Sequence, residues 1–351
     1  MAYRILYIED LIASSVEEDL RKIGYDITTN DANELNSLLD AINEDFDAYI
    51  FDYRLTANKG RLDAPALATA MRTKGANYKI APIILISSED YLKEFDKDLT
   101  SQELFDFAIS KKEFRSDIHK YARRIHSFVR AYKCITESEF GLDSIISKST
   151  DEINQLIDYR LIEKLQTDKI KDDVYAYCRF INYSLIRGIG PLIGKDILSA
   201  RLGVSKESKD WYRLIEIIEE YKYKGILSDV YERWWMEEIS EWWLKLSQGR
   251  SLRRLSSKER VEILSTCLEL ELNPIEPIKH SSSTYFWTIC METKEALDPS
   301  EGYIIDKKEI APWQEPEYLS LNSALEQSRY RKFLSPIDKE EIRNIEKNGT
   351  L

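Results

Sequence analysis

The sequence predicts an α/β doubly wound domain, a five-stranded parallel sheet covered by helices, followed by a mainly α-helical domain with a few short strands near the C-terminus. Over the first 133 residues, short apolar runs alternate with amphipathic helical segments, which is the pattern of a parallel sheet with helical crossovers. Beyond about residue 150 the apolar residues keep helical spacing, and strand-like runs separated by Pro and Gly appear only from Pro274 onward. A chain of 351 residues is long enough for two such domains.

Each element of the first domain follows from its local pattern. Five short apolar runs, rich in β-branched and aromatic residues, are predicted as strands: residues 5–8, 25–28, 48–51, 82–86 and 104–109. Apolar residues at helical spacing predict amphipathic helices between and after them: residues 16–23, 35–42, 64–71 and 115–132. We therefore expect one complete doubly wound domain over residues 1–133, a linker over 134–150 and a mainly helical domain over 151–351.

The composition is that of a folded protein. Hydrophobic residues make up 43% and charged residues 32% of the chain, a balance typical of globular proteins. No signal-peptide pattern and no run of about 18 to 20 apolar residues is visible, so we expect a cytoplasmic protein with no membrane partner. The net charge of −12 disfavours nucleic acid as a partner except through a local basic face.

Polar side chains suited to phosphoryl chemistry stand at the ends of four predicted strands. Glu9 and Asp10 follow the first strand, Asp52 the third, Ser87 the fourth and Lys111 the fifth. Because ligands bind beyond the carboxyl ends of the strands in a doubly wound sheet, we expect these groups to converge. Three carboxylates in one place repel one another and are best stabilised by a hard divalent cation such as Mg²⁺. The lysine and the hydroxyl can then hold the oxygens of an incoming phosphoryl group.

In four segments the chain resembles the receiver domains of two-component response regulators: residues 7–10 (YIED), 50–55 (IFDYRL), 84–88 (ILISS) and 108–111 (AISK). The order and approximate spacing of these segments match the family, and the likeness covers about residues 1–133. The resemblance implies that Asp52 is the phosphoacceptor and that Mg²⁺ is bound by Glu9, Asp10, Asp52 and the backbone carbonyl of Arg54. It also implies a histidine-kinase-like phosphodonor as a partner and a possible homodimer through the fourth and fifth receiver elements.

The same resemblance makes Ser87 the switch hydroxyl and Lys111 the lysine that pairs with the phosphate. The chain departs from the family at Lys112, which stands where a proline is usual, and at Ala108, which stands where an aromatic switch residue is usual. The loop over residues 56–63 is also longer than the usual turn. A receiver-shaped binding module that is never phosphorylated is therefore the alternative to a working phosphoacceptor.

A helix, a glycine turn and the start of a second helix are predicted near residues 195–215. This pattern offers a second alternative, a DNA-binding transcriptional regulator with a helix-turn-helix, in which Arg201 and Lys206 contact phosphates. Against it, polar Lys209 and Asp210 occupy the positions where the second helix needs an apolar residue to pack on the first. A plain helical hairpin is the favoured interpretation, so nucleic acid is a possible but not a favoured partner.

Two clusters of similar residues follow in the second domain. Four indoles fall within ten residues, and such a stripe is usually part of a core, with a protein-binding surface as the alternative: Trp234, Trp235, Trp242 and Trp243. On a helix, Trp235 and Trp242 would lie on one line. Basic residues just beyond are predicted to form a solvated face: Arg250, Arg253, Arg254, Lys258 and Arg260.

An enzyme in the second domain is the third class considered. His280 and Cys290 invite a base and nucleophile pairing, but no flanking motif supports it. The glycine-rich run over residues 187–194 lacks the strand and the Lys-Ser/Thr of a phosphate loop, which favours a turn between helices. The sequence therefore predicts a response regulator in which a receiver domain, phosphorylated on Asp52, controls a helical output domain that binds an unidentified protein.

Overall fold

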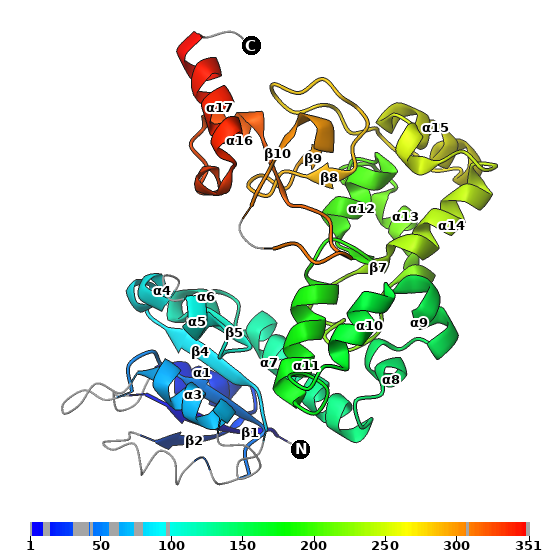
Figure 1. Ribbon diagram of the computed structural model, residues 1–351. Coiled ribbons are helices and arrows are strands. Elements are labelled where there is room, and N and C mark those ends of the chain that lie inside the picture. The colour runs from blue at the N-terminus through cyan, green and yellow to red at the C-terminus, as the bar shows by residue number, and fades with distance from the viewer. Residues whose placement is uncertain are drawn as a thin grey trace. The chain divides into compact units, whose positions relative to one another are not determined.

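The computed structural model describes residues 2–9, 15–30, 42, 45–55, 63–73, 80–95, 99–306 and 309–348. Its internal contacts divide the chain into two compact units. The first unit comprises Met1–Ile145, Thr167–Arg179 and Gly225–Val230, and the second comprises Ile146–Gln166, Phe180–Lys224 and Tyr231–Leu351. Figure 1 shows the elements of both units.

The first unit contains a five-stranded sheet with the strand order β2-β1-β3-β4-β5 and parallel pairing throughout. The strands are β1 Arg4–Ile8, β2 Asp26–Asn30, β3 Ala48–Phe51, β4 Ile83–Ser87 and β5 Phe107–Ser110. Every residue of β3 and β4 is buried, as expected for strands covered on both faces by helices (Figure 1). This strand order is that of the flavodoxin-like doubly wound fold, which confirms the predicted fold class.

Helices surround this sheet: α1 Ser15–Lys22, α3 Ala64–Thr73, α4 Glu89–Phe95, α5 Leu99–Gln102, α6 Lys111–Ser116 and α7 Ile118–Glu137. The single helix predicted over residues 115–132 is two helices, because Asp117 interrupts the backbone pattern and its carboxylate accepts a hydrogen bond from the Lys120 amide, which starts α7. The predicted helix over residues 35–42 lies outside the described residues, apart from Ile42.

The boundary between the units differs from the expected linker. Residues 134–150 were expected to connect the domains, but they contain the last turn of α7 and the helix α8 Leu142–Ile146. Helix α11, Val174–Phe180, also contributes to the first unit, since the guanidinium of Arg72 lies 3.5 Å from the ring centre of Tyr175. The first unit therefore recruits later segments of the chain that no local pattern connects with the sheet.

The second unit is mainly helical and carries short strands near the C-terminus, as predicted. Its helices are α9 Thr150–Leu156, α10 Tyr159–Leu165, the π-helix η2 Ile181–Ile186, α12 Lys195–Leu202, α13 Trp211–Ile217, α14 Met236–Leu246, α15 Ser257–Leu268, α16 Leu321–Leu325 and α17 Pro336–Asn348, with short 3₁₀ turns η3 Glu219–Tyr221, η4 Leu252–Arg254, η5 Pro299–Glu301 and η6 Arg331–Phe333. Its antiparallel strand pairs are β6 Leu192–Ile193 with β7 Trp234–Trp235, β8 Thr288–Ile289 with β9 Ala296–Leu297, and β10 Gly302–Ile304 with β11 Tyr318–Ser320.

The tryptophan cluster belongs to the core of the second unit. Trp234, Trp235 and Trp243 are at most 1% exposed, and Trp242 packs against the same core while partly buried. The core interpretation is therefore confirmed, but the expected common helix is wrong, because Trp234 and Trp235 form strand β7 ahead of α14. The indole nitrogen of Trp243 donates to the carbonyl of Arg250 at 2.8 Å, which satisfies its only polar atom.

Arg260 does not belong to the predicted solvated face. Its side chain is fully buried, and its Nη1 donates to the carbonyls of Ala200, Arg201 and Phe286 at 3.2, 2.9 and 2.8 Å. Burial lowers the pKa of Arg260 to about 10, so the guanidinium stays charged at neutral pH. This arginine joins α12 to the segment at Phe286 rather than facing water.

Gly203 provides a test of packing in the second unit. It ends α12 in the left-handed region, with φ +70°, and a Cβ atom there would lie 2.8 Å from the Cα atom of Ser257. Gly203→Ala should therefore lower the free energy of unfolding by about 2–4 kcal/mol, combining a left-handed alanine with overpacking. All seven tryptophans lie in the second unit, so tryptophan fluorescence during urea denaturation reports this loss.

Gly249→Ala is the matched control for that substitution. Gly249 also has a positive φ, +87°, but nothing lies within 4 Å of a Cβ atom built there. Only the left-handed penalty of about 1–2 kcal/mol should remain. Equal losses for the two variants would contradict the packing argument at Gly203.

Candidate functional site

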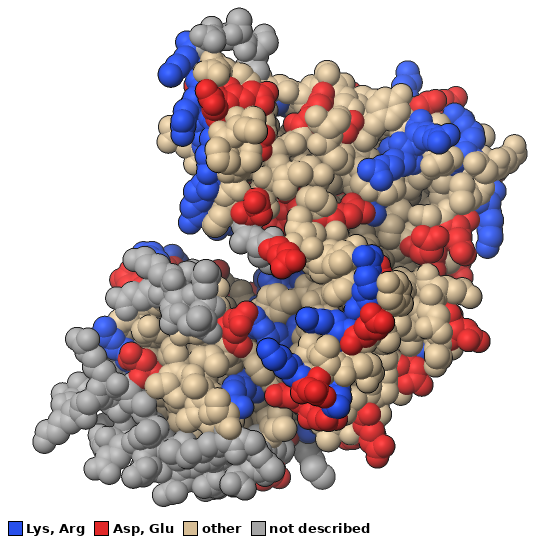
Figure 2. Space-filling view, in the orientation of Figure 1, with Lys and Arg blue, Asp and Glu red and all other residues tan. Residues whose placement is uncertain are grey.

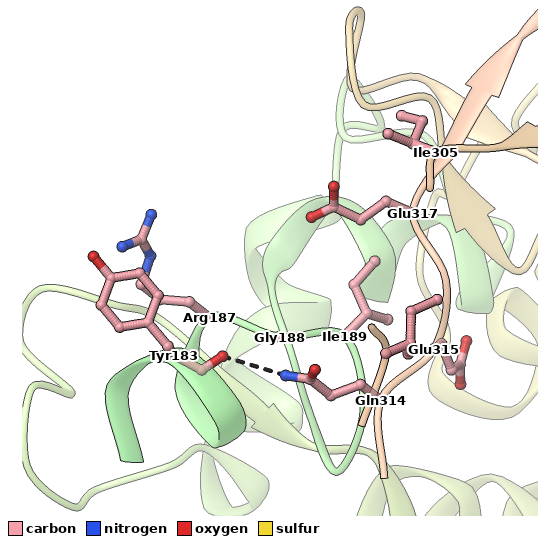
Figure 3. Close-up of a pocket in the computed structure, with 9 residues that line it drawn as sticks. Tyr183, Arg187, Gly188, Ile189, Ile305, Gln314, Glu315 and Glu317 are labelled. Carbon is pink, nitrogen blue, oxygen red and sulfur yellow. Dashed lines mark hydrogen bonds between the residues drawn. The ribbon is translucent and has the colours of Figure 1, made fainter. Parts of the chain in front are cut away.

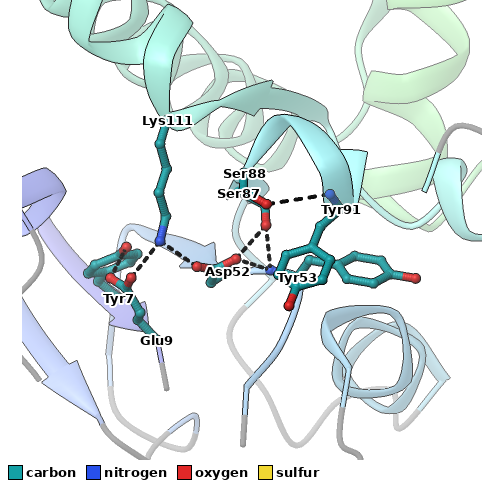
Figure 4. Close-up of polar contacts among 8 residues, drawn as sticks. All are labelled: Tyr7, Glu9, Asp52, Tyr53, Ser87, Ser88, Tyr91 and Lys111. Atoms are coloured by element: carbon teal, nitrogen blue, oxygen red, sulfur yellow. Dashed lines mark hydrogen bonds and ion pairs between the residues drawn. The ribbon is translucent and has the colours of Figure 1, made fainter. Parts of the chain in front are cut away.

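Four of the predicted site residues meet at the carboxyl edge of the sheet. Glu9 directly follows β1, Asp52 directly follows β3, Ser87 is the last residue of β4, and Lys111 is the first residue of α6 after β5. Figure 4 shows their side chains pointing toward one another from these elements. The fifth residue, Asp10, lies outside the described residues.

Asp52 is the centre of this arrangement, and only 6% of it is exposed. Its Oδ1 accepts hydrogen bonds from the Ser87 hydroxyl at 2.5 Å and from the backbone amide of Tyr53 at 2.6 Å. Its Oδ2 lies 2.5 Å from the Nζ of Lys111. Both oxygens of the carboxylate are thus oriented by donors at the carboxyl edge of the sheet (Figure 4).

Lys111 joins Asp52 to a second buried carboxylate. Its Nζ lies 2.5 Å from Oε1 of Glu9, and the hydroxyl of Tyr7 donates to Oε2 of the same carboxylate. Burial alone would lower the pKa of Lys111, but its hydrogen bonds to Asp52 and Glu9 outweigh burial and raise that pKa above its usual value. The ammonium is therefore charged at neutral pH and sits between two carboxylates.

A local sequence signal places Lys111 at this position. Ser110 and Glu113 form a capping box, in which the Ser110 hydroxyl accepts from the Glu113 amide and the Glu113 carboxylate accepts from the Ser110 amide. This box starts α6 at Lys111, immediately after β5 ends. The lysine is therefore held at the sheet edge by the start of a helix.

The two departures from the receiver family have defined positions. Among the described residues no peptide bond is cis, so the bond between Lys111 and Lys112 is trans. The Lys112 side chain is 80% exposed and lies 3.4 Å from the carboxylate of Glu89 at the start of α4. Ala108 is half-buried on β5.

An aromatic group that no sequence pattern predicted lies beside the site. The rings of Tyr53 and Tyr91 stack with their centres 5.8 Å apart, and the guanidinium of Arg54 lies 4.4 Å from the centre of the Tyr91 ring. Tyr91 belongs to α4, which begins just after Ser87 and Ser88. No spacing rule links Tyr91 to Asp52, so only the folded arrangement reveals it. The predicted role of the Arg54 carbonyl as a metal ligand stays a prediction.

The donor set fits a magnesium ion. Glu9 and Asp52 are buried carboxylates that share a single ammonium, so their pair carries one uncompensated negative charge. Carboxylate oxygens are the ligands that Mg²⁺ prefers. Within the described part of the chain no group of three acidic, histidine or cysteine side chains gathers, and the third predicted carboxylate, Asp10, lies outside that part.

The structure removes the main contact of the helix-turn-helix alternative. The side chain of Arg201 is 1% exposed, its Nη2 lies 2.8 Å from the Glu315 carboxylate, and it therefore does not face a phosphate. Lys206 is engaged with Asp196 at 2.5 Å. Residues 203–210 separate α12 from α13, whereas the turn of a helix-turn-helix has only about 3–4 residues.

Charge on the second unit is mixed. Figure 2 shows Lys and Arg side chains gathering near α14 and α15, with acidic side chains interspersed among them. One such pair joins Arg250 to Glu259 at 3.4 Å. Acidic partners such as Glu259 therefore offset part of the positive charge near α14 and α15.

The structure does not bring His280 and Cys290 together by any hydrogen bond among the described residues. Cys290 is fully buried, and its sulfur lies 3.3 Å from the hydroxyls of both Ser320 and Ser323. Burial would raise the pKa of this thiol, but hydrogen bonds from the two serines outweigh burial and lower it to about 7. A buried thiol held by serines gives no support to the base and nucleophile pairing.

The strand order and the polar groups at the carboxyl edge of the sheet together define a doubly wound domain with an acidic site beyond its strands. No family model and no curated protein sequence matches the chain. Solved structures similar to the first unit include the chemotaxis response regulator CheY4 of Vibrio cholerae, at 20% identity over 36% of this chain and 99% of that one, with a TM-score of 0.29. The response regulator TrrA of Thermotoga maritima, solved with Mg²⁺ and BeF, matches at 24% identity over 36% and 99% of the two chains, with a TM-score of 0.29.

A receiver domain of a sensor histidine kinase from Pseudomonas aeruginosa, with a magnesium ion coordinated in its active-site cleft, matches at 21% identity over 37% of this chain and 98% of that chain, with a TM-score of 0.30. These similarities cover the N-terminal part of the chain. In the described residues no helix is long and apolar enough to cross a bilayer.

Proposed function

We propose that the chain is a response regulator whose first unit accepts a phosphoryl group on Asp52 and whose helical second unit binds another protein. The observation that carries the proposal is the buried Asp52 carboxylate, held at 2.5 Å by both the Ser87 hydroxyl and the Lys111 ammonium. In an ordinary ion pair one cationic donor is enough for a carboxylate. A phosphoacceptor carboxylate also needs neighbouring donors that can hydrogen-bond to the oxygens of the transferred phosphoryl group. Ser87 and Lys111 meet that need.

The chemistry is a displacement at phosphorus. A carboxylate oxygen of Asp52 forms a bond to phosphorus as the bond from phosphorus to the donor breaks, and the leaving imidazole or acetate keeps the bonding electron pair. Lys111 and Ser87 then donate to the phosphoryl oxygens instead of to the carboxylate, which stabilises the charge that spreads over those oxygens. The product is an acyl phosphate on Asp52, and water reverses the modification by hydrolysis.

Glu9 and Asp52, joined by Asp10 and the Arg54 carbonyl as the receiver resemblance implies, would hold a Mg²⁺ ion. That ion supplies positive charge which offsets the repulsion between the carboxylates and the phosphodonor. The bound Mg²⁺ of the Pseudomonas receiver supports this assignment. Lys111, which bridges Glu9 and Asp52 at 2.5 Å, keeps the two carboxylates in place before the donor arrives.

Protein binding is the proposed output of the second unit. The buried Arg201 and its ion pair with Glu315 disfavour DNA contact through α12. A histidine-kinase-like protein is the proposed phosphodonor. The protein that binds the second unit would be recognised because its binding depends on whether Asp52 is phosphorylated.

Intact mass after incubation with acetyl phosphate and Mg²⁺ tests the phosphoacceptor. The wild type should gain one labile phosphate, and Asp52→Asn should gain none, because an amide oxygen is a poor nucleophile toward phosphorus. The matched control is Asp90→Asn, since the side chain of Asp90 is 89% exposed and lies 3.1 Å from the ammonium of Lys93. It should leave the adduct unchanged.

Two results would contradict the proposal. An adduct that persists in Asp52→Asn places the phosphate on another residue. A folded wild-type protein that forms no adduct with acetyl phosphate or with a phosphorylated histidine kinase supports the receiver-shaped binding module instead.

A further inference from the structure

A pocket of about 340 Å³ in the first unit belongs to no site described so far. Helix α7 forms one of its walls with Val129, Tyr132 and Thr136, and residues 80–82, which directly precede β4, form another. The chain ahead of a strand lies at the amino edge of a parallel sheet, whereas Asp52 follows β3 at the carboxyl edge. This space, which we call the α7 pocket, therefore lies at the opposite edge from the phosphoacceptor.

The α7 pocket exposes apolar surface that is otherwise buried in this unit. Ile80 is 49% exposed and is the one large hydrophobic residue of the first unit, among the described residues, that is exposed. Next to it, Val129 and Val174 line the pocket and are themselves buried in the fold. A ligand that covers Ile80 removes its apolar surface from water, which is favourable.

The donor side chains that line the α7 pocket already have acceptors within the first unit. The Tyr132 hydroxyl donates to Asp106 at 2.8 Å, and the Thr136 hydroxyl donates to the Tyr132 carbonyl at 3.0 Å. The ammonium of Lys133 lies 2.9 Å from the carboxylate of Asp47. A ligand therefore gains little from new hydrogen bonds, and its affinity must come mainly from the burial of apolar surface.

The charged groups of the α7 pocket disfavour a charged ligand. The hydrogen bond to Asp47 outweighs burial and raises the pKa of Lys133 above its usual value, and the charge of Glu137 adds to this rise. A ligand carboxylate would compete with Asp47 for Lys133 and would also meet the negative charge of Glu137. A ligand ammonium would meet Lys133. An uncharged molecule leaves the ion pair of Asp47 and Lys133 intact.

The volume sets the size of the ligand. An apolar cavity of about 150 Å³ holds a benzene ring, so about 340 Å³ has room for a fused bicyclic ring. This volume also reaches the range of about 300–1,000 Å³ that is usual for ligand pockets. A rigid ring loses less conformational freedom on binding than a flexible chain of the same size.

The second unit contains a cavity of a different character, shown in Figure 3. Its volume is about 210 Å³, and the side chains of Arg187 and Glu315 line it together with Ile189 and Ile305. Because it is smaller and is lined by charged groups, a bicyclic apolar molecule should not bind there. Its isoleucines therefore serve as an internal reference for binding to the α7 pocket.

We propose that the α7 pocket binds a small, uncharged, apolar molecule of the size of a fused bicyclic ring. Such a ligand contacts Val129, Val174 and the Tyr132 ring and covers Ile80. Because Ile80 and the Lys133 side chain are 49% and 46% exposed, the ligand stays partly in water. The affinity is therefore modest, with a dissociation constant of roughly 0.1–1 mM.

Methyl NMR of the full chain during titration with indole tests the proposal. The ring current of indole should shift the methyl resonances of Val129 and Val174 saturably, while those of Ile189 and Ile305 in the other cavity stay unchanged. Indole-3-acetate has the same ring and a carboxylate. It should bind to the α7 pocket at least about fivefold more weakly than indole, because its charge meets Asp47 and Glu137.

Two substitutions of one residue locate the binding. Thr136 is exposed on α7, so Thr136→Phe should fold while its phenyl group fills part of the pocket and weakens indole binding at least about tenfold. Thr136→Val keeps the shape of threonine, and its affinity should stay within about twofold of the wild type. Thermal melting establishes that both variants are folded.

Three results would overturn the proposal. The first is the absence of saturable shifts at Val129 and Val174 on addition of indole. The second is equal affinity of the α7 pocket for indole and indole-3-acetate. The third is equal indole binding by the folded Thr136→Phe and Thr136→Val variants.

Discussion

Lys111→Met should slow formation of the Asp52 phosphate by about 100- to 1000-fold, the usual cost of removing one positioned donor from a reacting oxyanion. The ammonium of Lys111 lies 2.5 Å from both Asp52 and Glu9, so it is the cation best placed to follow the charge onto the phosphoryl oxygens. Methionine keeps an unbranched apolar side chain but donates nothing. The measurement is the rate of adduct growth by intact mass at fixed acetyl phosphate and Mg²⁺.

The neighbouring lysine is the control for this rate. Lys112→Met removes a charge that is 80% exposed and touches only Glu89 among the described acidic groups, so the rate should stay within about twofold of the wild type. If the two lysine variants react at the same rate, Lys111 has no special part in the transfer.

A second readout separates the chemical role of Lys111 from a structural one. In the wild type the lysine occupies the two carboxylates that a metal ion needs, and its removal leaves Glu9 and Asp52 facing each other. The Lys111→Met variant should therefore show a larger rise in melting temperature on addition of Mg²⁺ than the wild type does. If Lys111 has only a structural role, the variant should melt at a lower temperature than the wild type by the same amount with and without Mg²⁺.

The sheet and its acidic site were predictable because both depend on local signals. The runs that became β3 and β4 are continuously apolar and are buried along their whole length. Once parallel strands are predicted, the residues that follow them must share one edge of the sheet, so the sequence alone predicts that Asp52, Ser87 and Lys111 converge. Their distances confirm the convergence.

The features that were not predictable depend on contacts between distant segments. In the sequence Arg260 is one more basic residue of a basic stretch. It is nevertheless buried, because residues about 26 to 60 positions away present three carbonyls to it. Trp234 and Trp235 form a strand because Leu192 and Ile193 pair with them. The recruitment of Tyr175 to Arg72 in the first unit likewise has no local signature.

That contact belongs to a buried ionic network in the first unit. Asp106, which directly precedes β5, is only 4% exposed and accepts hydrogen bonds from the Ile83 amide at 2.9 Å and from the Tyr132 hydroxyl at 2.8 Å. Its single partner of opposite charge among the described residues is Arg72, at 3.1 Å. The Arg72 guanidinium itself lies 3.5 Å from the centre of the Tyr175 ring. One ion pair therefore connects α3, β5, α7 and α11.

Arg72→Met should lower the free energy of unfolding of the first unit by about 3–5 kcal/mol, because it leaves the buried Asp106 carboxylate without a countercharge. The loss is measured by far-UV circular dichroism during urea denaturation, while tryptophan fluorescence follows the second unit as an internal reference, since the first unit contains no tryptophan. Lys93→Met, which breaks a largely exposed pair with Asp90, should cost less than about 1 kcal/mol.

The pH dependence and a double variant identify the cause of that loss. Burial already raises the pKa of Asp106, and removal of Arg72 raises it further. The native state then retains a proton that the unfolded state releases, so Arg72→Met should regain stability relative to the wild type as the pH falls from neutral toward about 4. Asp106→Asn in the same chain keeps the acceptor for Ile83 and Tyr132 without the charge, and should restore most of the loss at neutral pH. A deficit that is independent of pH and persists in the double variant would mean that Arg72 stabilises the unit by packing on Tyr175, not by neutralising Asp106.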